Sequence, residues 1–391
     1  MELQKIAQIC LPADRRISGA KLSEKNRYVD ATSFDTGRNT IAASKDIRSL
    51  MHSHHLFKEI HEGDILVSTR RWNLGAAAMV PSDLDGQAAS RDIVVLRPNH
   101  NVVERRYLFY FVSSRQFASM LSRKIQGAVD LSVSDSDFNE IELPLPDLCE
   151  QRRICEILDE TNNLRIQSDE IEKKYFRTLL ALYFEKFGDP ATNSKDWPVS
   201  PLETIITEKP QIGIHANSTN WTEGMPRYLR ISDITEKGHL EKSQRVSLDL
   251  EDWSSYRLTP GDLLFIRLSR RVGRTYLHQT EAESCVFSND MVRIKINRER
   301  MLPWYFFAFT QTDYFQKCIK VRKAPSIPEH VSVNDLLTIK IQIPPMAKQE
   351  TFAELIQSLH RIYVKQSTTK MNIQRICDNI IQRAFFSLHE Q

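Results

Sequence analysis

Two long segments of the chain place apolar residues at alternating steps of three and four and contain neither glycine nor proline. They cover residues 149–187 and 347–391, and each is much longer than an average helix. The repeating positions are Ile154, Ile157, Thr161, Leu164, Ser168, Ile171, Tyr175, Thr178 and Leu182 in the first segment, and Phe352, Leu355, Leu359, Ile362, Gln366, Thr369, Ile373, Ile376 and Ile380 in the second. A repeat of this spacing is typical of a coiled coil. We therefore predict two long helices that pair in antiparallel orientation; the alternative is that each packs separately on its own domain.

The segments in front of the two long helices are typical of mixed α and β structure. Short apolar runs bounded by glycine or proline predict strands at residues 64–67, 92–96, 262–266 and 291–296. The last of these runs alternates apolar and polar residues, as a half-buried strand does. Helical periodicity predicts further helices over about 104–125 and 303–321.

The second half of the chain repeats the first at a fixed offset. When residues 61–160 are compared with 259–358, matching residue types recur 198 positions apart, with no insertion over about 95 positions. The matches include Gly63 with Gly261, Asp92 with Asp290, Tyr107 with Tyr305, Pro146 with Pro344, Gln151 with Gln349 and Glu156 with Glu354. Chance matches would scatter over many offsets, so we infer a tandem duplication.

The duplication fixes the predicted architecture. The expected fold class is α+β, with two mixed α/β domains, each followed by a long helix, and with the two helices paired. The predicted segments are a first domain at 1–148, a first spacer helix at 149–187, a second domain at 188–346 and a second spacer helix at 347–391. Gly188, Asp189 and Pro190 mark the clearest boundary, because glycine and proline end the first long helix there.

Composition narrows the class of protein without identifying it. With 391 residues, of which 41% are hydrophobic and 26% charged, the chain is long enough for two to three folded domains. Its longest apolar runs are of about six residues, far short of the roughly 20 that a membrane span needs. The first ten residues lack the apolar core of a signal peptide, so we expect a cytoplasmic protein with reduced cysteines.

Sequence motifs for catalysis are missing. The closest of the 12 glycines are 11 residues apart, which excludes a glycine-rich phosphate loop, and neither HExxH nor GxSxG nor an NPPY-like tetrapeptide occurs. No two cysteines have CxxC spacing. The cluster of His52, His54 and His55 has no cysteine or carboxylate at matched spacing, so we expect a solvated loop there. We therefore expect no catalytic residue and no metal site; the enzyme alternative, a nuclease built on Pro146 and Asp147, is disfavoured because that pair leads into a helix.

Local basic stretches occur at matching points of both copies, although the net charge of the chain is only +3. They are Arg70, Arg71, Trp72, Asn73, Arg123 and Lys124 in the first copy, and Arg267, Arg270, Arg271, Arg274, Lys317, Lys320, Arg322 and Lys323 in the second. Arginine can bind guanine and asparagine can bind adenine through paired hydrogen bonds, whereas lysine suits phosphate. These residues are candidates for DNA contact; the alternative is ordinary surface charge.

A proline-containing junction in front of each long helix resembles a known family. The matching residues are Pro144, Pro146, Gln151, Ile154, Ile157 and Leu158 in the first copy, and Pro344, Pro345, Gln349, Phe352, Leu355 and Ile356 in the second. With the strand at 63–66, its match at 261–264 and the segment 127–138, they resemble the specificity subunits of type I restriction-modification systems over almost the whole chain. The second copy departs from the family in lacking a glycine that matches Gly127. The resemblance implies candidates for an interface with partner subunits: Gln151, Ile154, Leu158, Gln349, Phe352 and Leu355.

The resemblance implies a non-catalytic subunit that reads DNA. Each domain would read one half of a two-part, gapped sequence of double-stranded DNA, and the paired helices would set the gap. Two adenine methyltransferase subunits would supply S-adenosylmethionine, and a restriction and translocation subunit would use ATP and Mg. This chain would bind no cofactor itself and would work in the cytoplasm of a bacterium or archaeon, away from the membrane. The alternative is a coiled-coil interaction scaffold that binds no DNA.

Overall fold

The fold is that of a computed structural model of the chain. The described residues are 2–13, 16–17, 25–50, 57–70, 76–125, 135–240, 245–248, 250, 252–323 and 329–386. Within these ranges, no helix combines the length and apolar character that a membrane crossing requires. All six cysteines are described and free.

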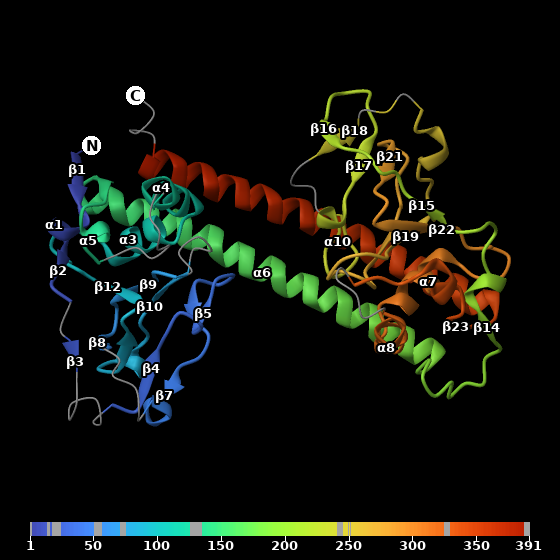
Figure 1. Cartoon of the computed structure of the whole chain (residues 1–391), viewed down its shortest axis with the longest axis horizontal. Helices are drawn as coiled ribbons and strands as arrows, with labels where there is room; N and C mark the ends of the chain where they lie inside the picture. The colour runs from blue at the N-terminus through green and yellow to red at the C-terminus, as the bar shows by residue number, and fades with distance from the viewer. Residues whose placement is uncertain are drawn as a thin grey trace. The chain divides into compact units, whose positions relative to one another are not determined.

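Two helices of unusual length dominate the chain (Figure 1). Helix α6 covers Leu148–Phe187 and helix α10 covers Met346–Ile381, with a π-helical turn, η7, at Gln382–Phe386. The carboxylate of Asp147 starts α6 by accepting a hydrogen bond from the amide of Glu150 at 2.9 Å. Both helices begin one residue before the predicted segments, which confirms the prediction drawn from their periodicity.

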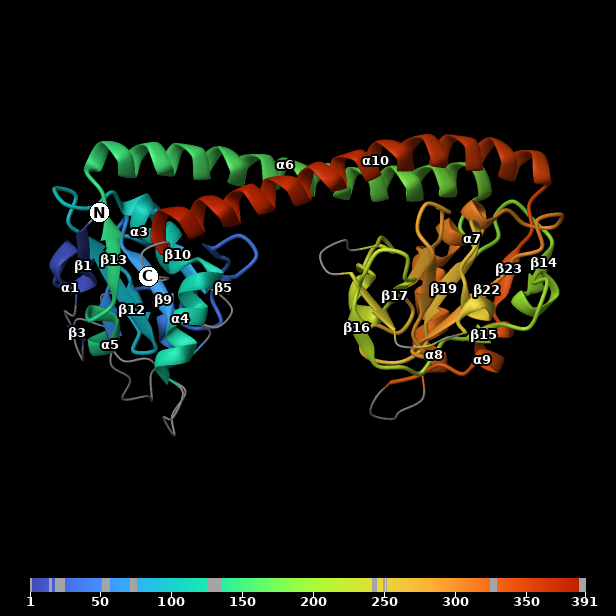
Figure 2. The same ribbon diagram turned by 90° about the horizontal axis from the view of Figure 1, so that it is seen from above.

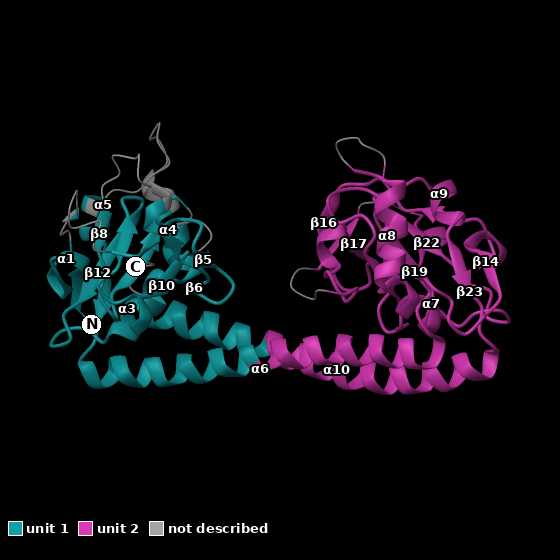
Figure 3. Ribbon diagram, turned by 90° about the horizontal axis from the view of Figure 1, so that it is seen from below, with its two compact units in different colours: residues 1–166, 372–391 teal, residues 167–371 magenta. Residues whose placement is uncertain are grey.

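The chain divides into two compact units, shown in different colours in Figure 3. Unit 1 consists of residues 1–166 and 372–391, and unit 2 consists of residues 167–371. The division runs through both long helices, so each helix contributes one part to each unit. The domain boundaries predicted from the sequence follow the helix ends instead, and they stay a prediction.

Unit 1 contains two main sheets, with strand orders β10-β9-β12-β2 and β3-β8-β11-β4-β7, and the pairs β1-β13 and β5-β6. Its strands are β1 (Glu2–Lys5), β2 (Cys10–Leu11), β3 (Arg16–Ile17), β4 (Arg27–Val29), β5 (Phe34–Asp35), β6 (Thr40–Ile41), β7 (Lys45–Asp46), β8 (Phe57–Glu59), β9 (Ile65–Ser68), β10 (Ala77–Met79), β11 (Ala88–Ser90), β12 (Ile93–Pro98) and β13 (Glu142–Leu145). Its shorter helices are α1 (Ile6–Ile9), α3 (Arg105–Val112), α4 (Arg115–Ile125) and α5 (Asp135–Asn139), with 3-10 turns η1 (Ile47–Leu50) and η3 (Ser82–Leu84).

Unit 2 contains a four-stranded sheet of order β15-β22-β19-β20 and three strand pairs, β14-β23, β16-β18 and β17-β21. Its strands are β14 (Val199–Pro201), β15 (Gln211–Ile212), β16 (Ser218–Asn220), β17 (Arg227–Leu229), β18 (Val246–Leu248), β19 (Leu263–Ile266), β20 (Thr275–Leu277), β21 (Cys285–Phe287), β22 (Met291–Ile294) and β23 (Lys340–Gln342). Its shorter helices are α7 (Pro303–Thr310), α8 (Asp313–Arg322) and α9 (Val333–Leu337), with 3-10 turns η4 (Leu202–Thr204), η5 (Ile231–Asp233) and η6 (Ser254–Tyr256).

The strand registers of the two units confirm the duplication. Val67 of β9 faces Val94 of β12, and at the equivalent positions of the second copy Phe265 of β19 faces Val292 of β22, in both cases antiparallel. A parallel pair also recurs, as β4 with β11 and as β17 with β21. The predicted α+β class with two related domains is therefore confirmed.

The two long helices run in opposite directions where they pair, as Figure 2 shows for each unit. The contacts are Tyr175 with Tyr363 (ring centroids 4.7 Å apart) and Phe187 with Phe352 (5.1 Å) in unit 2, and Thr161 with Cys377, through a side-chain hydrogen bond, in unit 1. In unit 2 the residue number rises along α6 as it falls along α10, which confirms antiparallel pairing.

The buried side of each long helix differs in part from the predicted repeat. Ile154 is buried as predicted, but Ile157 and Leu164 are exposed, and Leu158 is buried in place of Ile157. Within each unit, the parts of α6 and α10 pack against the domain of that unit as well as against each other. A helix in such a position buries a stripe wider than a two-helix seam. The same correction applies to α10, where Leu355, Ile362 and Ile376 of the predicted repeat are exposed.

Candidate nucleic-acid interface

In each copy, a buried glutamine joins the proline-containing junction to the preceding loop through three hydrogen bonds, an arrangement that we refer to as the glutamine closure. The Gln151 amide donates to the carbonyls of Pro146 (2.8 Å) and Val102 (3.2 Å), and its side-chain oxygen accepts from the backbone amide of Glu104 (2.8 Å). Gln349 makes the matching bonds in the second copy, with Pro344 (2.8 Å), Arg300 (3.3 Å) and Leu302 (2.8 Å). Both glutamines are fully buried. Neither is available to a partner subunit in this structure, which corrects the expectation that they form that interface.

The remaining partner candidates divide into buried and exposed residues. Ile154, Leu158 and Phe352 pack inside their own units, so the structure gives them a place in the core. Leu355 is 40% exposed, and its counterpart in the first copy, Ile157, is 41% exposed. Only Leu355 among the six candidates therefore presents an apolar side chain at the surface.

The exposed apolar residues form a repeated pattern on the long helices. Ile157 and Leu164 lie two turns apart on α6, and Leu355 and Ile362 occupy the equivalent positions of the second copy on α10. We refer to these four residues as the repeated apolar stripe. Exposed apolar groups that cluster on a surface mark interaction sites more often than isolated ones do.

Two of the basic candidates in unit 2 support a turn of the backbone. Arg271 Nη1 donates to the carbonyl oxygens of Ile231 (3.0 Å) and Ser232 (3.3 Å), and Arg274 Nη1 lies 3.5 Å from the carbonyl oxygen of Ile234. Burial and the neighbouring Arg271 lower the pKa of Arg274. Both guanidinium groups thus donate to carbonyls of η5 or of the residue that follows it, a role that the sequence pattern did not indicate.

Three more basic candidates have partners within unit 2. Arg267 Nε donates to the carbonyl of Asn289 at 3.3 Å. Arg322 donates to the carbonyl of Cys318 at 3.1 Å, and Lys323 forms an ion pair with Glu329 at 2.7 Å. These side chains are half-buried, so less of their charge is presented to a ligand than the sequence predicted.

Arg270, Lys317 and Lys320 are the exposed basic residues of this region. None of them forms an ion pair or hydrogen bond with another residue in the described part of the chain. The Gln316 amide of α8 donates to the Gly273 carbonyl at 3.1 Å, which holds α8 beside the turn that carries Arg270. The three cations therefore lie on adjacent elements, and we refer to them as the basic face of unit 2.

The basic candidates of unit 1 are only partly described. Arg70 follows β9, is exposed, and lies 3.2 Å from the carboxylate of Asp92. Arg71, Trp72 and Asn73 lie outside the described residues. Arg123 and Lys124 belong to α4, but their side chains also lie outside the described part. The assignment of these five residues to DNA contact stays a prediction.

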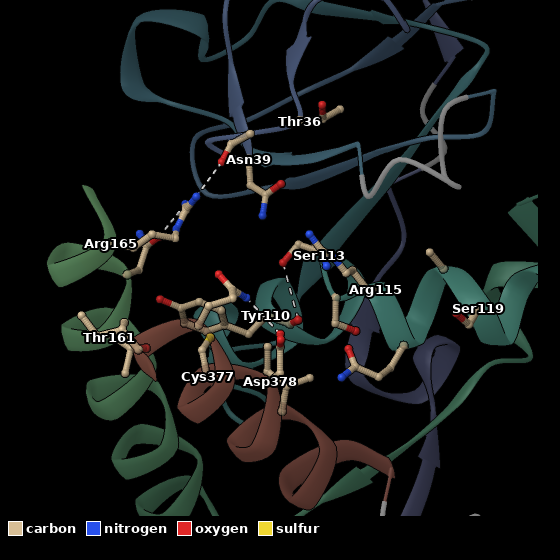
Figure 4. Close-up of a pocket in the computed structure, with 18 residues that line it drawn as sticks. Thr36, Asn39, Tyr110, Ser113, Arg115, Ser119, Thr161, Arg165, Cys377 and Asp378 are labelled. Carbon is tan, nitrogen blue, oxygen red and sulfur yellow. Dashed lines mark hydrogen bonds between the residues drawn. The ribbon is translucent and has the colours of Figure 1, made fainter. Parts of the chain in front are cut away.

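Unit 1 has a polar cleft of about 710 Å³ at the corner between its domain and its parts of the long helices. Figure 4 shows Arg165 reaching from α6 toward the loop that bears Asn39. Its guanidinium donates to the Gly37 carbonyl (3.0 Å) and to the Asn162 side-chain oxygen (2.9 Å). Arg115, at the first turn of α4, is an exposed cation on the rim. Such amide and guanidinium groups suit nucleic acid, and the sequence did not reveal them because four separate segments supply them.

The equivalent corner of unit 2 is aromatic. His360 and Tyr363 stand at the positions of the second copy that match Asn162 and Arg165, and Tyr363 packs on His239 with ring centroids 4.0 Å apart. Burial, with a smaller contribution from His360, lowers the pKa of His239 to about 3. Burial lowers the pKa of His360 to about 4. Both imidazoles are therefore uncharged at neutral pH.

Comparison with known proteins supports the family that the sequence resembles. Residues 17–174 match the family model of the type I restriction modification DNA specificity domain. The specificity subunit of the type I restriction enzyme EcoKI from Escherichia coli K12 is 20% identical over 316 residues, which cover 74% of this chain and 67% of that one. The MjaVIII specificity subunit from Methanocaldococcus jannaschii is 20% identical over 333 residues, or 81% and 76% of the two chains.

Solved structures share the fold. The type I restriction-modification S subunit from M. genitalium matches 98% of this chain and 96% of its own length, with a TM-score of 0.55 at 14% identity. A chain from a structural study of assembly and conformational transition in a type I system matches 98% and 97%, with a TM-score of 0.52 at 20% identity. The comparisons favour a specificity subunit over a scaffold that binds no DNA. By the family model over residues 17–174 and by relatives that match most of its length, the chain is similar to the specificity subunits of type I restriction-modification systems.

Proposed function

We propose that this chain selects the DNA sequence on which a type I complex acts, and that each unit reads one half of a two-part, gapped target. The observation that carries the proposal is that the two units share one backbone arrangement but differ in the side chains where the long helices meet each domain. The glutamine closure recurs bond for bond, whereas Asn162 and Arg165 are replaced by His360 and Tyr363. Two related but unequal readers call for two unequal half-sites.

In unit 2, DNA contact is proposed for the basic face of Arg270, Lys317 and Lys320. These side chains are exposed, and DNA phosphates attract such unpaired cations. In unit 1, DNA contact is proposed for Arg115 at the rim of the polar cleft and for the residues predicted from the sequence, Arg70, Arg71, Trp72, Asn73, Arg123 and Lys124. Arg271 and Arg274 are not proposed to contact DNA directly, because their guanidinium groups donate hydrogen bonds to backbone carbonyls.

Partner subunits are proposed to dock on the repeated apolar stripe. Ile157 and Leu164 in unit 1 match Leu355 and Ile362 in unit 2, so one kind of partner would find an equivalent patch in each unit. Two copies of a methyltransferase subunit fit this repeat. The chain itself is proposed to be non-catalytic. The partners would bring S-adenosylmethionine and the methyl-transfer residues, and a restriction subunit would bring ATP and Mg.

The test is a map of methylated adenines in host DNA, obtained by long-read sequencing with the gene intact, deleted and restored. The expected result is a gapped, two-part methyladenine motif that disappears on deletion and returns on restoration. The map would also give both half-sites and the gap. Methylation that persists unchanged in the deletion strain, with the methyltransferase subunit still expressed, would contradict the proposal.

A further inference from the structure

Unit 2 contains a cavity of about 690 Å³ whose lining residues include His360 and Tyr363. It lies between α7, α10 and the segments 221–227 and 279–284. A cavity of this size is within the usual range for small-molecule sites and exceeds the volume of a single amino-acid side chain. The chemistry of its walls therefore indicates which class of ligand it would hold.

One wall of the cavity consists of aromatic rings. Trp304 meets His360 with ring centroids 4.9 Å apart, and His239 meets Tyr363 at 4.0 Å. Phe307 completes this wall and contacts Trp304 at 6.0 Å. These contacts leave Trp304 and Tyr363 almost fully buried, whereas His360 is half-buried. The wall therefore offers an apolar, aromatic surface against which a flat ligand can pack.

The aromatic wall includes one buried polar group with an unused capacity for hydrogen bonding. His239 is only 7% exposed, and its Nε2 has no hydrogen-bond partner among the residues that the structure describes. A buried polar atom left without a partner is costly, and such atoms are enriched where a ligand or water completes the bonding. The uncharged imidazole suits an uncharged heterocycle better than it suits a cation.

The lining of the cavity also carries a charge close to an aromatic face. The guanidinium of Arg245 lies over the ring of Trp221, 5.2 Å from its centroid, and is paired with Glu283 at 3.4 Å. Its side chain is 47% exposed, so it can meet an anionic group at the mouth. The Trp221 indole is itself held by the Met225 carbonyl at 3.2 Å. The cavity thus combines an aromatic wall with an exposed cation among its lining residues.

We propose that this cavity binds one unpaired nucleotide, with its base against the wall of Trp304, His360 and Tyr363 and its phosphate at Arg245. The ligand chemistry is shared by two sources, a free mononucleotide and an extrahelical nucleotide of bound DNA. Only the second source rests on the proposed function. The first would make unit 2 a nucleotide-binding domain whether or not it reads DNA.

The experiment uses the full chain and AMP as the probe, with tryptophan fluorescence and calorimetry as readouts. Val364 lines the cavity from α10 and is 36% exposed, so Val364→Trp fills the cavity without burying a new group in the core. Thr369→Trp, an exposed position of the same helix that does not line the cavity, is the matched control. AMP affinity should fall about tenfold or more in V364W and stay unchanged in T369W.

A second variant separates the phosphate from the base. Arg245→Gln should weaken AMP severalfold and leave adenosine binding unchanged, because only AMP carries the phosphate. Equal loss for both ligands would overturn the placement of the phosphate. Circular dichroism of each variant checks that it is folded.

Two duplexes distinguish the sources of the nucleotide. One carries a single unpaired adenine and the other is fully paired, and both are offered to wild type and V364W. Tighter binding of the bulged duplex that V364W abolishes points to a nucleotide of DNA, whereas AMP binding alone points to a free nucleotide. If neither AMP nor the bulge shows binding that V364W removes, the proposal is wrong. Fully paired DNA read normally in the same assay would show that the proposed function survives.

Discussion

The region where a long helix faces a loop of the domain occurs once in each unit. A comparison of these two corners shows which features the two copies share and which differ. In unit 1, Asn162 and Arg165 line a polar cleft, and Arg165 donates to the backbone of the facing loop. In unit 2, His360 and Tyr363 occupy the same positions, and a ring contact with His239 replaces that hydrogen bond. The helix and the loop meet in both corners, but the chemistry offered to a ligand differs.

The contrast with the glutamine closure shows why the corners could diverge where the closure did not. Gln151 and Gln349 each satisfy two carbonyls and one amide that the fold buries. Any other side chain there leaves buried backbone groups unpaired, so the fold restricts the choice. At the corners, Arg165 forms a hydrogen bond with the loop and Tyr363 forms a ring contact. The fold is therefore compatible with either kind of side chain.

The largest expected effect concerns the segment that carries the two readers. Removal of seven residues, two helical turns, from α6 within 155–185 and from the facing stretch of α10 shortens both helices by about 10 Å, or about three base pairs of DNA. We expect a methylated motif with a shorter gap and both half-sites unchanged. Sequencing of methyladenine in the variant strain measures both. An altered half-site with an unchanged gap would refute the assignment of the helices as spacer.

The glutamine closures should prove equally important in both units. Gln151→Leu and Gln349→Leu each leave two carbonyls and an amide without their partner, so each should lower the free energy of unfolding by about 3 kcal/mol. Urea denaturation followed by circular dichroism measures the change. Leu355→Ser, which alters only an exposed position, is the control. Unequal losses at the two glutamines would break the equivalence of the units.

The aromatic corner should make unit 2 the acid-sensitive one. Because the folded pKa values of His239 and His360 are lowered to about 3 and about 4 from an ordinary 6.5, the unfolded chain binds more protons below pH 6.5. Stability is therefore lost as the pH falls from 6.5 toward 4, by up to about 2 kcal/mol per imidazole at pH 5. His360→Asn, which copies Asn162 of unit 1, should reduce the loss between pH 7.5 and 5.0 in urea denaturation. An unchanged pH dependence in this variant would contradict the lowered pKa.

The smallest effects are expected at the basic face of unit 2. Alanine at Arg270, Lys317 or Lys320 should weaken DNA binding by the assembled complex severalfold, and removal of one phosphate contact should reduce the slope of the salt dependence by about one. Titration of a fluorescent duplex at several salt concentrations gives both numbers. Arg271→Ala is the contrasting variant, since the loss of its hydrogen bonds to backbone carbonyls should lower the free energy of unfolding more than it weakens DNA binding. If R270A, K317A and K320A all bind DNA as wild type does, the face does not bind phosphate.

Sequence reasoning succeeded where one physical constraint decided the outcome. A run without glycine or proline fixed both long helices to within one residue at their starts, and a constant offset identified the duplication. It failed in part on the helix seam, because the spacing of three or four could not tell whether Ile157 or Leu158 points inward. That choice depends on the domain against which α6 packs.

Side-chain partners from distant segments were beyond what the sequence could show. Arg270 and Arg271 are neighbours in an acid-free stretch, yet one is exposed and the other is bonded to carbonyls of η5, far earlier in the chain. The cavity of unit 2 draws its walls from segments as far apart as Trp221 and Val364. Neither residue stood out in its own sequence surroundings.

The π-helical turn at the end of α10 has a consequence for the order of synthesis. Phe385 and Phe386 lie in the core of unit 1, where Phe385 packs on Tyr107 at 4.7 Å and Phe386 stacks on Phe111 at 5.7 Å. A ribosome makes these two phenylalanines only after all of unit 2 has been translated. The unit that leaves the ribosome first is therefore completed last, and until then its unfinished core is a surface that a nascent chain must keep from aggregating.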